Sequence, residues 1–91
     1  MKQIEVIKFW ADWCVPCKHY GDMMLTVRPE FPDVKFRSID VEEDVDTTEF
    51  YGIRSLPTTV ITVDGEVVTR LVGSKKREEL VNALTEVVNN N

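Results

Sequence analysis

Two cysteines three positions apart are the residues of this chain best suited to chemistry. Cys14 and Cys17 lie in "FWADWCVPCK", residues 9–18, and the chain has no other cysteine. A zinc site needs three or four protein ligands, and the only histidine is His19, two residues after Cys17. A zinc ion bridging two chains of a dimer stays open as an alternative. A purely structural disulfide at this spacing closes too short a loop to add much stability.

The spacing of the pair favours redox chemistry. A thiolate that attacks a disulfide needs a second thiol within reach to resolve the resulting mixed disulfide. At the start of a helix, Cys14 faces free backbone N–H groups and the positive end of the helix dipole, which stabilise its thiolate. Cys17 lies one turn further in and is more shielded. The sequence therefore predicts Cys14 as the nucleophile and Cys17 as the resolving thiol.

Length and charge exclude several other classes of protein. The 91 residues suffice for a single domain, residues 1–91, and the net charge of −5 disfavours nucleic acid and anionic membranes as partners. The opening "MKQIEVIKFWADWC" lacks the uninterrupted apolar region of a signal peptide. We therefore expect a cytoplasmic protein, in which a close cysteine pair is more often catalytic or metal-binding than structural.

The first half of the chain has a strand–helix–strand pattern around the cysteines. Residues 3–11 are apolar on both faces and predict a central strand. From residue 15 to 31, apolar residues recur at spacings of three and four, which predicts a helix with Pro16 in its first turn. Residues 34–41 alternate between apolar and polar and predict a second strand. A C-x-x-C motif between a strand and a helix in this pattern is a strong redox signal.

The second half predicts a short helix, a hairpin and a final helix. The short helix ends at Gly52, and two apolar runs flank Asp64-Gly65, a pair suited to a tight turn. Ser74 is the predicted N-cap of the last helix, whose apolar face is formed by Leu80, Val81, Leu84, Val87 and Val88. The predicted class is α/β: a four-stranded mixed sheet, βαβ then ββα, with helices on both faces.

Two stretches resemble the thioredoxin family. "FWADWCVPCK" is similar to the active-site stretch of thioredoxins, commonly F-W-A-x-W-C-G-P-C-K, and "YGIRSLPTTV", residues 51–60, resembles their segment containing a cis-proline followed by threonine. Gly65 and Gly73 follow Pro57 at spacings of eight, as family glycines do. The resemblance runs from about residue 3 to residue 88. Because the usual leading strand and helix have no counterpart, it implies a minimal, glutaredoxin-sized thioredoxin fold.

The resemblance also implies roles for residues outside the cysteine pair. Trp10 would pack beneath the site, although a core tryptophan without a role is an equal alternative. The backbone of Leu56 would pair with an extended substrate peptide, and the Leu56–Pro57 bond would be cis, where an ordinary Leu-Pro is trans. The implied substrate-binding residues are Trp13, Pro16, Leu56, Pro57 and Gly73.

The implied activity is that of a monomeric protein disulfide reductase. It would reduce disulfide-containing proteins, bind no cofactor, and receive electrons from NADPH through thioredoxin reductase at its Cys14–Cys17 disulfide. The hairpin and Gly73 are more similar to thioredoxin than to glutaredoxin. Two alternatives remain: a glutathione-dependent, glutaredoxin-like reductase, and a thioredoxin-fold binding subunit that acts independently of its thiols.

Three positions depart from the family pattern. Val15 replaces the usual glycine between the cysteines, and Asp22 replaces a kinking proline in the helix. Lys8 stands where the family has a buried aspartate that helps to deprotonate the resolving cysteine. Lys8 has three possible roles: it extends to the surface without a function, it remains charged and favours thiolates, or it is a neutral general base. Its apolar neighbours predict partial burial, and we favour the charged form.

Overall fold

The computed structural model describes residues 2–91 and contains a four-stranded mixed sheet in the order β2-β1-β3-β4. The predicted α/β architecture is therefore confirmed. The elements in chain order are β1 (Ile4–Trp10), α1 (Val15–Val27), the 3₁₀ turn η1 (Arg28–Glu30), β2 (Lys35–Asp40), α2 (Val45–Phe50), β3 (Thr58–Val63), β4 (Glu66–Val72) and α3 (Arg77–Asn89).

The central strand β1 brings the functional segments together. It pairs in parallel with β2 and antiparallel with β3, and β3 pairs antiparallel with β4. In this register Lys8 lies between Ser38 of β2 and Thr59 of β3. The carboxyl end of β1 leads directly into the turn before α1, so the cysteine pair lies just beyond the carboxyl end of an inner strand.

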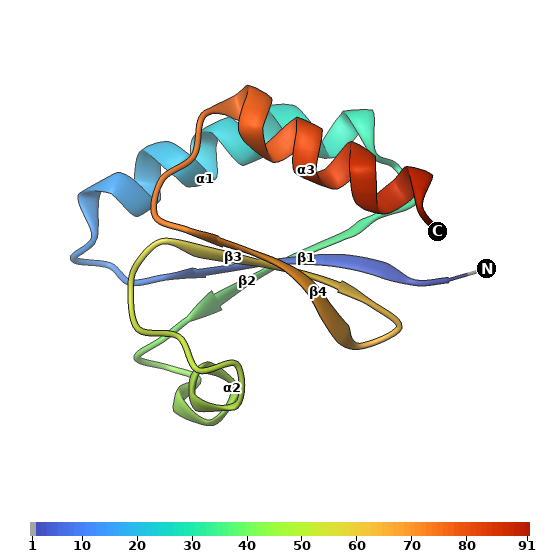
Figure 1. Ribbon diagram of the computed structural model, residues 1–91. Coiled ribbons are helices and arrows are strands. Elements are labelled where there is room, and N and C mark those ends of the chain that lie inside the picture. Colours follow the sequence, from blue (N-terminus) through green and yellow to red (C-terminus); the bar gives the residue numbers. More distant parts are fainter. Residues whose placement is uncertain (1) are drawn as a thin grey trace.

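Helices cover both faces of the sheet, α1 and α3 on one face and α2 on the other (Figure 1). Side chains alternate along β1, so that Val6 joins the core under α1 and α3 while Ile7 and Phe9 join the core under α2. Because Lys8 has the same parity as Val6, its side chain is directed toward the α1 and α3 layer.

The hairpin turn has the predicted geometry. Asp64 and Gly65 both adopt positive φ, 51° and 86°, which is the conformation of a two-residue turn that matches the strand twist. The Asp64 carboxylate accepts a hydrogen bond from the Gln3 N–H at 2.8 Å, and the Asp64 N–H donates to the Gln3 carbonyl at 2.8 Å. The turn is thus held against the segment that leads into β1.

Some helix details differ from the prediction. The helix expected over residues 15–31 ends at Val27 and continues as η1, because Pro29 lacks the N–H that another α-helical turn needs. The predicted cap at Ser74 is wrong, since the N-cap of α3 is Lys76. The Lys76 N–H donates to the Glu79 carboxylate at 3.2 Å, which satisfies a free group at this helix start.

The buried face of α3 is narrower than predicted. Leu80, Leu84 and Val87 are buried in the core, whereas Val88 is 37% exposed.

Within residues 2–91, every helix is too short or too polar to cross a membrane.

Candidate active site

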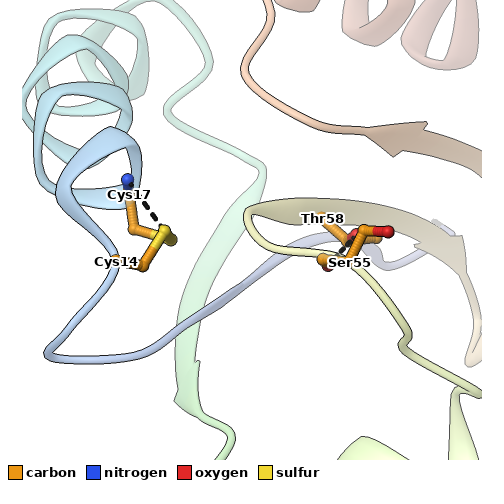
Figure 2. The surroundings of a disulfide bond; sticks show 4 residues. All are labelled: Cys14, Cys17, Ser55 and Thr58. Carbon is orange, nitrogen blue, oxygen red and sulfur yellow. Dashed lines mark hydrogen bonds between the residues drawn. A yellow bond between two sulfur atoms is a disulfide. The ribbon is translucent and has the colours of Figure 1, made fainter.

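The cysteine pair lies at the N-terminal end of α1, where the two sulfurs form a disulfide (Figure 2). Cys14 is the N-cap residue and has an extended backbone, with φ −90° and ψ 97°. The Cys17 N–H donates a hydrogen bond to the Cys14 sulfur at 3.3 Å. The sulfur of Cys14 therefore occupies the position at which a helix stabilises negative charge.

The two cysteines differ in their exposure to solvent. Cys14 is 6% exposed and Cys17 is 2% exposed, and both pack with the buried Ala11. Trp10 and Leu56 pack against this cluster, so Trp10 is a half-buried support of the pair. A partner molecule therefore has better access to Cys14 than to Cys17.

An apolar surface surrounds Cys14. Trp13 and Val15, on either side of Cys14, are 65% and 61% exposed. A neighbouring cavity of about 300 Å³ is lined by Trp13, Val41, Thr48, Ile53, Arg54 and Leu56. Sequence reasoning missed Val41, Thr48, Ile53 and Arg54, since no motif marks these positions. The exposed apolar surface suits a docked polypeptide.

The loop before β3 has its backbone available for pairing. The Leu56–Pro57 bond is cis, and Thr58 Oγ1 donates to the Ser55 carbonyl at 2.6 Å in the loop drawn beside the disulfide (Figure 2). The Gly73 N–H donates to the Pro57 carbonyl at 2.8 Å. Within residues 2–91, no backbone hydrogen bond of this loop engages the N–H or carbonyl of Leu56.

Pro16 does not line the cavity beside Trp13. A separate cavity of about 350 Å³ is lined by Val15, Pro16, His19, Tyr20, Met23, Ser74 and Lys75. Pro16 is exposed there, so the structure gives it a surface position beside the pair. His19 lines the same cavity. In the described part of the chain, no group of three His, Cys, Asp or Glu side chains is arranged to hold a metal ion.

Lys8 is half-buried in a cleft that reaches Cys17. The cleft has a volume of about 520 Å³ and is lined by Lys8, Trp10, Cys17, Lys18, Gly21, Asp22, Leu25 and Ser38. Burial lowers the pKa of Lys8 from its ordinary 10.5, and the negative charge of Asp22 acts in the opposite direction. Lys8 and the resolving cysteine thus share one cleft.

Tyr20 ties α1 to the sheet beside this lysine. Its hydroxyl and that of Thr59, the β3 neighbour of Lys8, form a buried hydrogen bond of 2.7 Å. Burial raises the pKa of Tyr20 above 10.0, and the hydrogen bond with Thr59 only partly opposes this effect. The bond fixes the face that α1 presents to Lys8.

Gly21 is a residue of the cleft that sequence reasoning missed. A Cβ atom at this position would lie 2.5 Å from the Lys8 Nζ, so the lysine occupies the space left by the missing side chain. A signal was available, because an isolated glycine inside a helix weakens it and often has a packing reason. The partner of that glycine could not be identified without the tertiary structure.

Comparison with known proteins relates these features to one family. The thioredoxin family model matches residues 1–86. The chain is 42% identical over 87 residues to the thioredoxin of Bacillus subtilis, with 94% of this chain and 80% of the relative covered. It is 35% identical over 81 residues to the thioredoxin of Listeria monocytogenes, with 88% and 79% covered.

Solved structures of similar proteins agree with the sequence comparison. The thioredoxin of Fasciola hepatica superimposes with a TM-score of 0.86 and 28% identity, covering 92% of this chain and 80% of that one. The thioredoxin of Malassezia sympodialis superimposes with a TM-score of 0.85 and 34% identity, with 92% and 74% covered.

Proposed function

Because the chain belongs to the thioredoxin family and is a thiol–disulfide oxidoreductase, a protein-disulfide reductase, we propose that Cys14-Val-Pro-Cys17 is its dithiol active site. The observation that carries the proposal is the position of Cys14. Its sulfur caps α1, accepts the Cys17 N–H at 3.3 Å and is bonded to Cys17. This arrangement supplies an activated nucleophile with a resolving thiol in reach.

The reaction follows from the two cysteines. In the reduced protein the Cys14 thiolate attacks one sulfur of a substrate disulfide, the substrate bond breaks, and its other sulfur leaves as a thiolate that takes up a proton. Cys17 then loses its proton and attacks the Cys14 sulfur, which releases the second substrate sulfur as a thiolate that also takes up a proton. The substrate gains two electrons and two protons, and the Cys14–Cys17 disulfide remains.

The substrate lies across the surface formed by Trp13, Pro16, Leu56 and Gly73, and the fully buried Pro57 binds it only by shaping the loop beneath. The free N–H and carbonyl of Leu56 support pairing with an extended peptide, which would add to the protein like a strand. The hydrogen bond from the Gly73 N–H to the Pro57 carbonyl holds the two loops of this surface together. Trp13 contributes exposed aromatic area beside the nucleophile.

Lys8 acts as a fixed positive charge. Burial lowers the pKa of Lys8, the negative charge of Asp22 opposes this effect, and the partial exposure of the side chain lets water stabilise the ammonium form. A positive charge in the cleft with Cys17 favours thiolates over thiols. In this proposal, the lysine contributes through its field and does not exchange protons.

The electron donor, the compartment and the assembly are those of a thioredoxin. Thioredoxin reductase returns electrons from NADPH to the Cys14–Cys17 disulfide, in the cytoplasm, and the protein acts as a monomer on disulfide-containing proteins. The proposal rests on the likeness to thioredoxins and on the apolar docking surface around Cys14. Turnover with reductase and NADPH supports it, whereas turnover only with glutathione and its reductase would assign a glutaredoxin-like role.

Substrate trapping tests the roles of the two cysteines. Cys17→Ser should accumulate mixed disulfides with substrate proteins through Cys14, because the resolving thiol is missing. Cys14→Ser should trap few or none, since the activated nucleophile is missing. Non-reducing gels with and without dithiothreitol measure both. Equal trapping by the two variants would overturn the assignment, and so would faster alkylation of Cys17 than of Cys14 in the reduced protein.

The double variant Cys14→Ser/Cys17→Ser separates catalysis from binding. It should lose all reductase activity and fail to replace the wild-type protein in the cell. Full function of the double variant would favour a binding subunit that acts without its thiols.

A further inference from the structure

The position of Gly21 on α1 relates it to both Cys17 and Lys8. Residues four apart on a helix lie on the same face, so Gly21 follows Cys17 one turn along the wall of the cleft. Lys8 reaches this wall from β1, and its Nζ lies 2.5 Å from the position that a Cβ at residue 21 would take. The ammonium therefore lies against bare helix backbone beside the resolving cysteine.

We propose that Gly21 is a positioning residue for the Lys8 ammonium: the missing side chain lets the charge lie against α1, one turn from Cys17. The inference rests on the charged role of Lys8 proposed above and deepens it. Gly21 touches no reacting atom and acts only through the lysine.

The contact distances predict what a methyl group at position 21 would do. A Cβ atom 2.5 Å from the lysine nitrogen cannot be accommodated, whereas the Lys8 Cε is 3.9 Å away, an ordinary contact. The nitrogen is the end of a flexible side chain, so it would move away while the backbone stays in place. Gly21→Ala should thus fold normally and displace the charge from Cys17.

Among the other groups around the lysine, Asp22 attracts the ammonium through its negative charge, but this attraction does not limit how closely the nitrogen approaches α1. On α1 the charged or titratable side chains are Cys17, Lys18 and Asp22 in the cleft, His19 in the separate cavity beside Pro16, and Tyr20, whose hydroxyl is hydrogen-bonded to that of Thr59. From the neighbouring strands, Ser38 and Thr59 contribute only hydroxyl groups. The steric limit on the position of the ammonium is therefore the helix surface at Gly21.

The test compares the wild type with Gly21→Ala, Lys8→Met and the double variant. Methionine follows the lysine stem as far as the Cε position and has no atom at Nζ, so it removes both the charge and the clash. The thiol titration of each reduced protein is followed by ultraviolet thiolate absorbance, and thermal unfolding is measured in parallel. Lys18→Met is the matched control, because it removes an exposed lysine from the same cleft.

Gly21→Ala should shift the thiol titration upward in pH, as Lys8→Met does, and the double variant should titrate like Lys8→Met alone. In the Lys8→Met background Gly21→Ala should raise the melting temperature, because alanine is the better helix former and meets no clash. Lys18→Met should shift the titration less than Lys8→Met.

The outcomes separate this inference from the function on which it rests. A shift in Lys8→Met without one in Gly21→Ala overturns the role of Gly21 and leaves that of Lys8 intact. Equal shifts by Gly21→Ala with and without Lys8 also overturn it, because the glycine would then act by another route. If neither variant shifts the titration, the charged role of Lys8 fails as well. Unfolding of Gly21→Ala that Lys8→Met does not rescue counts against the inference, and rescue supports it.

Discussion

Replacing Lys8 by methionine isolates the electrostatic part of the site. The variant keeps an unbranched apolar side chain of similar reach in the half-buried cleft and removes one positive charge. The loss of that charge should make the thiols harder to ionise, because a nearby ammonium stabilises a thiolate. The size of the effect depends on the distance between the charge and the sulfur and on the screening by water.

The structure bounds that distance. The Lys8 Nζ is 2.5 Å from the Cβ position of residue 21, and Cβ atoms four residues apart on a helix are about 5–6 Å apart. Taking a separation of about 6 Å from Cys17, Coulomb's law gives about 0.7 kcal/mol in water and about 2.8 kcal/mol at an effective dielectric constant of 20. Because Lys8 is half exposed, we expect a value toward the lower end, which is about 0.5 to 1 pH unit in the thiol titration.

The rate should change less than the ionisation. A thiol that ionises at higher pH is also the better nucleophile once ionised, with a Brønsted coefficient of about 0.4–0.5. Below the titration midpoint, Lys8→Met should therefore reduce disulfides about 2- to 4-fold more slowly. Above the midpoint the difference should vanish or reverse. Insulin reduction measured across a pH series in low salt, beside ultraviolet titration of the thiols, tests both parts.

Two results would refute this reasoning in different ways. Unchanged titration together with unchanged turnover would leave Lys8 as a side chain that extends to the surface without a role. Unchanged titration with turnover lost at every pH would point instead to a neutral Lys8 that accepts a proton from Cys17. Added salt should shrink the difference between wild type and variant only if the effect is electrostatic.

Two further predictions concern stability and pH. Tyr20→Phe leaves the fully buried Thr59 hydroxyl without its 2.7 Å partner and should lower the free energy of unfolding by about 1–3 kcal/mol. Adding Thr59→Val should cost less than the sum of the single changes in denaturant titrations; strict additivity would argue against coupling. Because burial raises the pKa of Tyr20, wild-type stability should fall as pH rises past 10.0, and Tyr20→Phe should lack this part of the loss. At the start of α2, hydrogen bonds from the Thr47 side chain and from the Thr47 N–H lower the pKa of Asp44 below 3.8. The stability from this cap is present above pH 3.8 and is lost as pH falls through the lowered pKa. Asp44→Ala should therefore have a lower melting temperature at neutral pH, and its melting temperature should fall less steeply on acidification. An unchanged acid dependence of the melting temperature would contradict this assignment.

Features that depend on neighbours in the chain were predictable from the sequence. The start of α1 beside the cysteines follows from the end of an apolar strand and from Pro16, which suits a first helical turn. The hairpin turn follows from Asp64 and Gly65, because both residues tolerate the positive φ that the turn requires. These signals act over four residues or fewer, so no knowledge of the packed structure was needed.

The start of α3 shows where local signals compete. Ser74 and the Lys76–Glu79 pair lie within one turn of each other, and either is able to satisfy free N–H groups. The helix begins at Arg77, where the Lys76 N–H donates to the Glu79 carboxylate, and Leu80 and Leu84 lie in the core beneath it. Both local signals are compatible with burial of these side chains, so the sequence does not decide between them.

Contacts between distant parts of the chain were decided by the tertiary structure alone. The sequence places Lys8 in a central strand and Gly21 in a helix, but only the crossover from β1 through α1 brings the lysine nitrogen against that glycine. Strand pairing likewise brings the Gly73 N–H to the Pro57 carbonyl. Such contacts depend on which face each element buries and on its register against the sheet. These are set by the packing free energy of the whole domain, which no stretch of a few residues contains.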